Sequence, residues 1–184
     1  MSDTSLREQL LELVKARAVL HGEFTLKSGK KSRYYIDMRL LTLDARAAHL
    51  IGRLMLDVVR RERIDAVGGP SLGADPIVGA TLAVAGGERV PLSGFLVRSA
   101  VKEHGTQKLV EGPLKKGQRV LIVEDTVTTG GSLLKAAEEV KKVGAEIVMI
   151  APLVDRLQGA REAAEAASYR FEPIFTVRDL GVGE

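Results

Sequence analysis

The sequence contains no cysteine, and aromatic residues occupy only 4% of its 184 positions. The lack of cysteine excludes disulfide bonds and thiolate metal sites, which is consistent with a cytoplasmic protein. Met1 does not open a charged-then-apolar secretory leader, and no apolar run is long enough to span a bilayer. We therefore expect a soluble, cytoplasmic protein that makes no membrane contact.

Strong charge of one sign is also missing, since the formal net charge is +3. Two segments, residues 27–31 and 98–108, each concentrate three lysines and arginines, and we expect acidic small molecules as their ligands in preference to nucleic acid. The three histidines, His21, His49 and His104, show no metal-ligand spacing, and we expect no metal site made by protein ligands alone.

Repeats, low-complexity segments and linkers are absent too, which indicates one domain over residues 1–184. Ser5 and Glu8 form a possible capping box for a first helix, and Asp44 precedes a second helix that extends to about Arg61. Further along, strand and helix patterns alternate. This predicts an α/β fold, a central parallel sheet flanked by helices, with strands near Ala66, Gly94, Val120, Ile147 and Phe171 and helices near Pro76, Leu134 and Ala163.

The most informative segment is VLIVEDTVTTGGSLL, residues 120–134. Four apolar residues, 120–123, predict a strand that is covered on both faces, with Glu124 and Asp125 emerging at its carboxyl end. A loop from Thr126 to Ser132 follows. Its backbone N–H groups can surround an anion that also meets the N-terminus of the next helix, which ends at Gly144.

Two carboxylates beside an anion loop require an explanation, because they repel a phosphate. Vicinal sugar hydroxyls that donate to the carboxylates, with a divalent cation nearby, provide one. The alternatives are the metal strand of a nucleotide hydrolase or an ordinary strand that ends in a solvated turn. The chain lacks the GxxxxGK[ST] loop of the first. Against the alternative of an ordinary strand and turn, turn chemistry alone poorly explains why apolar, acidic, hydroxyl and glycine residues follow one another in this order.

VLIVEDTVTTGGS resembles the phosphoribosyl diphosphate (PRPP) signature of type I phosphoribosyltransferases. Three further segments make the chain similar to the orotate phosphoribosyltransferases, from about Phe24 to Arg156. The resemblance implies the type I phosphoribosyltransferase fold, with a small N-terminal hood formed by about residues 1–40 and a C-terminal segment. It also implies that the 5′-phosphate and ribose of PRPP bind the residues Glu124, Asp125, Thr126, Val127, Thr128, Thr129, Gly130, Gly131 and Ser132.

The first further segment is FTLKSGKKSRYYIDMR, residues 24–39, which predicts two short strands, 23–26 and 33–38, joined by a basic turn. A solvated hairpin with tyrosines in the core is the alternative. By resemblance the segment closes the base pocket, where Lys27 reaches both reactants and Tyr34 or Tyr35 lies near the pyrimidine.

The second is RSAVKEHGTQKLVEG, residues 98–112, which predicts a long loop after a strand at 92–97. A solvated charged loop is the alternative. The similar loop of the family closes over the diphosphate of PRPP in the neighbouring subunit. Arg98, Lys102 and His104 match it, whereas Ser99 stands where lysine is usual. We expect Lys102 to contribute most to catalysis.

The third is GGPSLGADPIVGA, residues 68–80, which predicts a loop between a strand at 66–67 and a helix that begins near Asp75. By resemblance this loop holds the diphosphate, although Leu72 occupies a position near which many members carry lysine. A smaller match, APLVDRLQG, makes Arg156 the candidate ligand of the base. Its alternative is an exposed ion pair with Asp155.

The resemblance implies transfer of the 5-phosphoribosyl group from PRPP to orotate, giving orotidine 5′-monophosphate and diphosphate, a step of de novo UMP biosynthesis. It implies a homodimer with shared active sites and Mg²⁺ carried mainly by PRPP. The expected catalytic residues are Lys102, Arg98, His104 and Asp125, and the expected orotate ligands are Lys27, Tyr34, Tyr35, Thr128 and Arg156. A purine or uracil phosphoribosyltransferase, or a PRPP sensor without turnover, would retain the PRPP loop.

Overall fold

The computed structural model describes residues 3–25, 31–100 and 108–182. The N-terminal part comprises α1 (Asp3–Leu13), the π-helical turn η1 (Val14–Ala18), the antiparallel pair β1 (Val19–Thr25) and β2 (Lys31–Ile36), and α2 (Arg39–Thr42). The remaining elements are α3 (Ala45–Glu62), β3 (Ala66–Pro70), α4 (Ala74–Gly87), β4 (Ser93–Val97), β5 (Val110–Glu111), β6 (Arg119–Val127), α5 (Gly131–Val143), β7 (Glu146–Asp155), α6 (Ala160–Ala166) and β8 (Phe175–Thr176).

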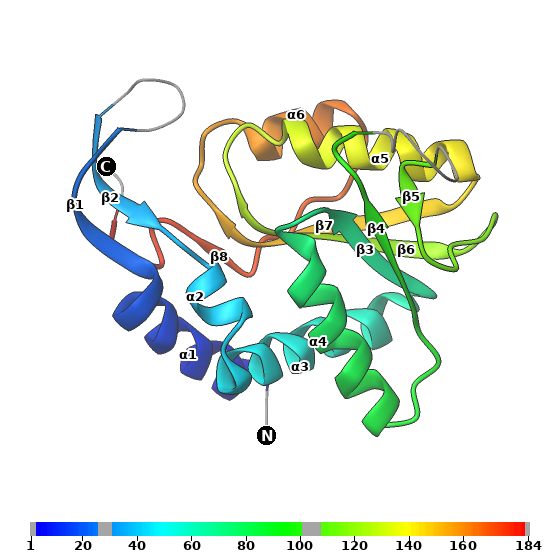
Figure 1. Ribbon diagram of the computed structural model, residues 1–184, viewed down its shortest axis with the longest axis horizontal. Coiled ribbons are helices and arrows are strands. Elements are labelled where there is room, and N and C mark those ends of the chain that lie inside the picture. Colours follow the sequence, from blue (N-terminus) through cyan, green and yellow to red (C-terminus); the bar gives the residue numbers. More distant parts are fainter. Residues whose placement is uncertain (1–2, 26–30, 101–107, 183–184) are drawn as a thin grey trace.

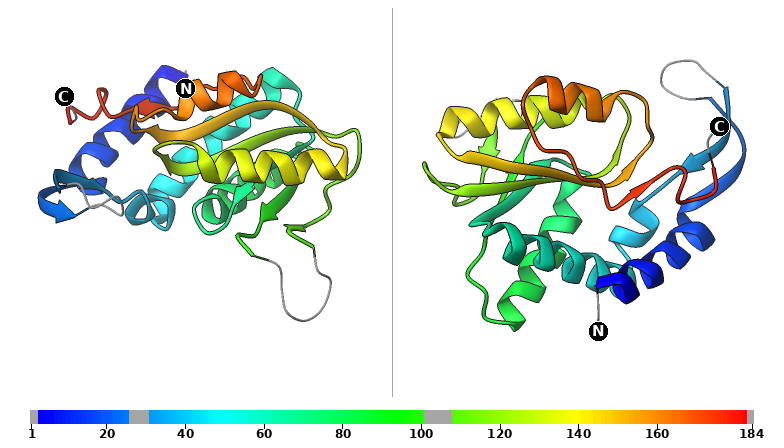
Figure 2. Two further views of the ribbon diagram at one scale, coloured as in Figure 1. Left: turned by 90° about the horizontal axis from the view of Figure 1, so that it is seen from above. Right: turned by 180° about the vertical axis from the view of Figure 1, so that it is seen from behind.

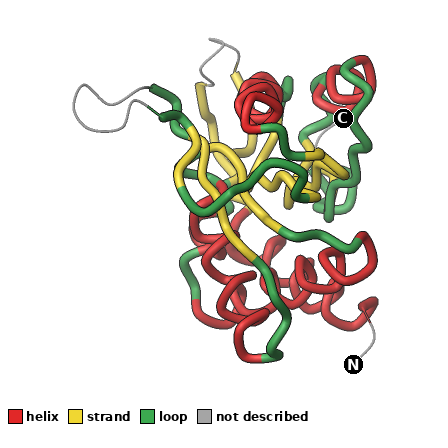
Figure 3. Tube along the Cα trace, turned by 90° about the vertical axis from the view of Figure 1, so that its right-hand side faces the viewer, coloured by secondary structure: helices red, strands yellow, loops and turns green. Residues whose placement is uncertain are grey.

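Six strands form the central sheet in the order β5-β4-β3-β6-β7-β8. Every neighbouring pair is parallel except β4 and β5, so the predicted parallel sheet carries one antiparallel edge strand. Helices α5 and α6 cover one face of the sheet, and α1, α3 and α4 lie on the other (Figures 1 and 3). The predicted α/β fold with helices on both faces is confirmed.

Strand β6 is buried because apolar side chains point from it into both layers. Leu121 and Val123 belong to the core beneath the sheet, together with α1, α3 and α4. Val120 and Ile122 belong to the core between the sheet and helices α5 and α6. This is the double coverage that the continuous apolar run predicts.

Several predicted boundaries were wrong. Strand β6 continues to Val127, because its pairing with β7 extends to the pair Val127 and Asp155, so Glu124 and Asp125 lie within the strand. Strand β3 also includes Gly68, Gly69 and Pro70, which were expected in a loop. The approach of β6 explains the glycine at 69, since a Cβ there would lie 2.0 Å from the carbonyl oxygen of Val123.

Other differences concern chain segments at the sheet edges. Strand β1 begins at Val19 and β2 ends at Ile36, because Met38 already precedes α2. The loop after β4 was expected to lack regular structure, but it returns as β5 and pairs with β4. Phe171 makes only an isolated bridge with Ile150, and the last strand is β8. Asp44 does cap α3, since its carboxylate accepts a hydrogen bond from the Ala47 amide at 3.0 Å.

The hairpin of β1 and β2 stands beyond the carboxyl ends of β6 and β7, next to the residues that follow β8 (Figures 1 and 2). The side chain of Arg7 connects α1 with the C-terminal segment around β8. It donates to the Ile174 carbonyl at 3.1 Å and to the Asp179 carboxylate at 3.3 Å. No helix within the described residues is long and apolar enough to cross a membrane.

Candidate active site

Glu124 and Asp125 lie near the carboxyl end of β6, where the parallel strands of the sheet end. Glu124 is 7% exposed, and one of its oxygens accepts a hydrogen bond from the Ser132 hydroxyl at 3.3 Å. That bond joins the strand to the first turn of α5. The segment from Thr128 to Gly130 therefore forms a short turn between the carboxylates and the helix, with Gly130 in a left-handed conformation at φ 79°.

The environment of the two carboxylates favours their protonated forms. Burial, reinforced by the negative charge of Asp125, raises the pKa of Glu124 to about 8. Burial also raises the pKa of Asp125, against the effect of the Thr126 amide, which donates to its carboxylate at 2.6 Å. A site that disfavours two negative charges is suited to hydroxyl groups and a cation, which would both stabilise the ionised carboxylates.

The loop that follows β3 contacts this pair of carboxylates. A Cβ at Gly73 would lie 2.0 Å from Glu124 Oε1 and 2.8 Å from Asp125 Oδ1. The peptide between Ser71 and Leu72 is cis, and the Ser71 hydroxyl donates to Asp75 at 2.8 Å. Asp75, which fixes this serine, was not among the predicted site residues.

A cavity of about 790 Å³ opens on the hood side of the carboxyl edge. It is lined by Ser32, Arg33, Tyr34, Arg156, Leu157, Gln158, Val177, Arg178 and Gly181. The Arg156 guanidinium lies over the Tyr34 ring, 5.5 Å from the ring centroid, and Arg156 is only 9% exposed. Its Nε has no hydrogen-bond partner among the described residues. We call this space the Arg156 cavity.

The Arg156 cavity is directly connected to the turn at the end of β6. The Arg156 amide donates to the Val127 carbonyl at 3.0 Å, so the arginine is adjacent to the predicted phosphate loop. The ion pair of Arg156 with Asp155 that the sequence left open does not form. Asp155 is fully buried, and its carboxylate accepts from the Leu157 amide at 2.9 Å.

The structure distinguishes the two tyrosines of β2. Tyr34 lines the Arg156 cavity, whereas the Tyr35 ring packs against Phe24 of β1 with centroids 5.7 Å apart. Neighbouring residues of a strand face opposite sides, and this explains the separation. The sequence could not distinguish the two tyrosines, because the side of the hairpin that faces the cavity is determined by tertiary packing.

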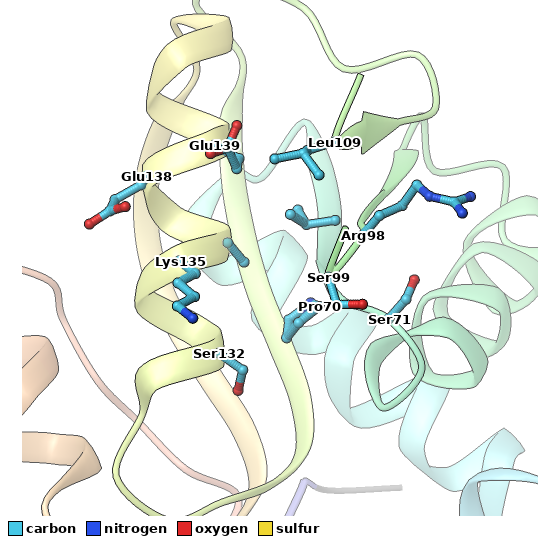
Figure 4. Close-up of a pocket in the computed structure, with 11 residues that line it drawn as sticks. Pro70, Ser71, Arg98, Ser99, Leu109, Ser132, Lys135, Glu138 and Glu139 are labelled. Atoms are coloured by element: carbon cyan, nitrogen blue, oxygen red, sulfur yellow. The ribbon is translucent and has the colours of Figure 1, made fainter. Parts of the chain in front are cut away.

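A second cavity, of about 350 Å³, lies between α5 and the ends of β3 and β4. Ser132 and Lys135 of α5 face Ser71 and Ser99 across it (Figure 4). The Arg98 guanidinium points away from α5 and lies 3.8 Å from the Glu111 carboxylate (Figure 4). Arg98 is therefore not directed at the phosphate loop of its own chain.

The described part of the chain brings residues 124–132, Tyr34 and Arg156 to one edge of the sheet. Lys27, Lys102 and His104, which the sequence also predicted, lie outside the described residues. Within those residues, no group of three or more histidine, aspartate or glutamate side chains could hold a metal ion. Sequence reasoning missed Gln158 and Arg178 as lining residues. Gln158 lies within the APLVDRLQG segment, where only Arg156 was selected, and Arg178 belongs to no motif recognised in the sequence.

Comparison with known proteins agrees with this geometry. The family model for the phosphoribosyl transferase domain matches residues 41–177. The orotate phosphoribosyltransferase of Streptomyces avermitilis is 50% identical over 169 residues, which cover 90% of this chain and 93% of that protein. Two crystal structures of the Mycobacterium tuberculosis orotate phosphoribosyltransferase each cover 96% of this chain and 99% of their own. The complex with Fe(III) dicitrate is 46% identical with a TM-score of 0.85, and the PRPP complex is 43% identical with a TM-score of 0.81.

Proposed function

The chain belongs to the phosphoribosyl transferase domain family, and among its members to the orotate phosphoribosyltransferases, and on this basis we propose how its residues share the reaction. The reaction transfers the 5-phosphoribosyl group from PRPP to orotate and releases diphosphate, giving orotidine 5′-monophosphate for pyrimidine nucleotide synthesis. The observation that carries the assignment of roles is the hydrogen bond from the Arg156 amide to the Val127 carbonyl. It places a cavity suited to a planar anion beside a turn suited to a phosphate.

PRPP occupies the end of β6 in this proposal. The amides and hydroxyls of residues 126–132 hold the 5′-phosphate at the N-terminus of α5, where the helix dipole favours an anion. Glu124 and Asp125 accept hydrogen bonds from the ribose hydroxyls. As positive charge develops on the sugar, Asp125 stabilises it, and the low polarity that raises the carboxyl pKa values strengthens this interaction.

Orotate occupies the Arg156 cavity. Its carboxylate pairs with the Arg156 guanidinium, whose orientation is set by the Tyr34 ring. Thr128 lies in the turn that follows Val127, between the two substrates. Lys27, which lies outside the described residues, is assigned to bind both reactants in this proposal. The ring nitrogen of orotate then displaces diphosphate at the anomeric carbon, so the protein supplies mainly positioning and electrostatic stabilisation.

The departing diphosphate is neutralised by Arg98, Lys102 and His104 of a second subunit. The direction of Arg98 away from the phosphate loop of its own chain supports a homodimer with shared active sites. The hydrogen bonds of Arg7 to Ile174 and Asp179 support a single domain, in which α1 and the C-terminal segment belong to the same hood.

Mg²⁺ dependence is part of the same proposal. The raised carboxyl pKa values of Glu124 and Asp125 fit a site that receives a cation together with its substrate. Magnesium retains water ligands and prefers substrate oxygens, so PRPP would carry it, and the carboxylates of Glu124 and Asp125 would be the protein groups available to it there. When bound, the ion neutralises negative charge on the diphosphate.

The test is loss of orotate absorbance when PRPP and Mg²⁺ are added to the purified protein, with adenine, hypoxanthine and uracil in parallel. Turnover of orotate alone is the expected result. Turnover of a purine or of uracil in place of orotate would contradict the substrate assignment. Binding of PRPP without turnover of any base would favour a sensor over an enzyme.

A further inference from the structure

Arginines other than Arg156 also line the Arg156 cavity. Three arginine residues are among its lining residues, Arg33 of β2, Arg156 directly after β7 and Arg178 two residues after β8. No described aspartate or glutamate lines it. The cavity is therefore an anion-selective space, and only Arg156 was expected from the sequence to bind the base.

Arg178 is held beside Arg156 by the backbone of the sheet. Strands β7 and β8 pair through Asp155 and Thr176, and the Val177 amide donates to the Asp155 carbonyl at 3.0 Å. The carbonyl of Arg178 then accepts from the Gly181 amide at 3.1 Å, which closes a turn. These bonds hold the backbone after the two strands, which carries Arg156 directly after β7 and Arg178 two residues after β8. Both residues line the cavity.

The charge of Arg178 is not satisfied within the described residues. Its side chain makes no hydrogen bond or ion pair with any of them, in contrast to Arg7, which binds the neighbouring Asp179. The Asp179 carboxylate also accepts from the Thr176 amide at 2.7 Å and from its hydroxyl at 2.9 Å. The acidic residue next in sequence is thus already engaged, which leaves the Arg178 guanidinium available to a ligand.

We propose that Arg178 is a second anion-binding residue of the Arg156 cavity and selects a base that carries a carboxylate. This inference rests on the proposed function, since it concerns the same base pocket. Arg156, fixed over the Tyr34 ring, supplies a rigid and largely buried guanidinium. Arg178 is exposed and adds a second guanidinium when a carboxylate enters. A neutral pyrimidine such as uracil gives this residue nothing to bind.

The experiment compares steady-state kinetics of the wild type, Arg178→Ala, Arg178→Lys and the control Arg46→Ala. Arg46 is an exposed arginine in the first turn of α3 that lines neither cavity, so its removal matches the change in net charge. For Arg178→Ala we expect the KM for orotate to rise about tenfold, as for loss of one charge-assisted hydrogen bond. The KM for PRPP and kcat should change less than about twofold, because Arg178 contacts neither PRPP nor the reacting atoms in this arrangement.

Arg178→Lys should fall between the wild type and Arg178→Ala, since it retains the charge and loses the planar fork. Thermal unfolding of each variant identifies a folding defect, and if Arg178→Ala fails to fold, Arg178→Lys carries the test alone. An unchanged KM for orotate in the folded variants, with orotate still turned over, would overturn the role of Arg178 alone. A wild-type protein that turns over no base would instead overturn the proposed function.

Discussion

The guanidinium of Arg156 lies over the ring of Tyr34, with 5.5 Å between its central carbon and the ring centroid. The two residues come from β2 and the end of β7, which are far apart in the sequence and belong to different sheets. A cation above an aromatic face is attracted by the ring quadrupole, more strongly when both groups are withdrawn from water. The contact therefore fixes the orientation of the arginine before any substrate enters.

Replacing Tyr34 should weaken orotate binding more than replacing Tyr35. For Tyr34→Ala we expect the KM for orotate to rise roughly three- to thirtyfold, the range that corresponds to loss of a cation–π contact. Tyr34→Phe retains a ring and should recover most of the affinity. Tyr35→Ala is the matched control, since Tyr35 packs on Phe24 and should affect mainly thermal stability. Equal KM changes for the two alanine variants would contradict the assignment of Tyr34 to the pocket.

The raised pKa of Glu124 predicts that the protein loses stability as the pH rises. Its carboxyl group has an ordinary pKa of 4.5 and a pKa of about 8 in the folded chain. Between those values the folded state binds a proton that the unfolded state has released, so the free energy of unfolding falls with increasing pH. Glu124→Gln removes the group that titrates. The variant should therefore show a shallower decline of thermal midpoint from pH 5 to pH 8.

The control for that series is Glu138→Gln, which makes the same substitution at an exposed carboxylate of α5. It should reproduce the wild-type pH dependence. The decisive observation is the slope of the midpoint against pH, not its value at one pH. Parallel slopes for the wild type and Glu124→Gln would show that burial of Glu124 does not control the pH dependence of the thermal midpoint.

The sequence was sufficient to locate β6 and its turn, since a continuous apolar run followed by acids and glycines is a local pattern. It was not sufficient to show how far β6 extends, because the added length depends on pairing of Val127 with Asp155. The burial of Glu124 is likewise a tertiary property. It arises from contact with the loop at Gly73, which lies about fifty residues earlier in the chain.

The base pocket was less predictable than the phosphate turn. Arg156 could be found because it follows a strand within a family motif, but Arg178 follows the two-residue strand β8, which has no apolar run to indicate it. The orientation of Arg98 toward Glu111 could not be predicted from the sequence either, because Glu111 is brought there by the short strand β5. Residues brought together by edge strands leave little periodic signal, whereas central strands leave a strong one.

A hybrid dimer should recover activity if the active sites are shared. Lys102 lies outside the described residues, and Asp125 lies on β6. We expect Lys102→Ala to lower kcat far more than it weakens orotate binding, and Asp125→Asn also to be impaired. Mixing the two variants under conditions of verified subunit exchange should restore part of the activity, because one of the two sites in a hybrid then contains both wild-type residues. Unrestored activity would argue that each subunit acts alone.

Gly73 offers a test of how closely the carboxylates must be positioned. Its backbone adopts right-handed helical angles, φ −59° and ψ −40°, so alanine introduces no backbone strain there. The added Cβ would nevertheless lie 2.0 Å from Glu124 Oε1 and 2.8 Å from Asp125 Oδ1. Both carboxylates would have to move. We expect kcat/KM for PRPP to fall roughly ten- to hundredfold, since displacement of positioning groups by about 1 Å has effects of that size.

Gly79→Ala is the matched control, because it makes the same substitution in the interior of α4 where a Cβ would meet nothing within 4 Å. Alanine restricts the unfolded chain and favours the helix, so this variant should be more stable by about 0.5–1 kcal/mol and fully active. Thermal unfolding and PRPP kinetics of both variants separate the two effects. If Gly73→Ala keeps its PRPP kinetics, the loop must be able to move away from β6, and Glu124 would not depend on that contact for its position. If both variants lose activity, the defect lies in α4 and not in the carboxylates.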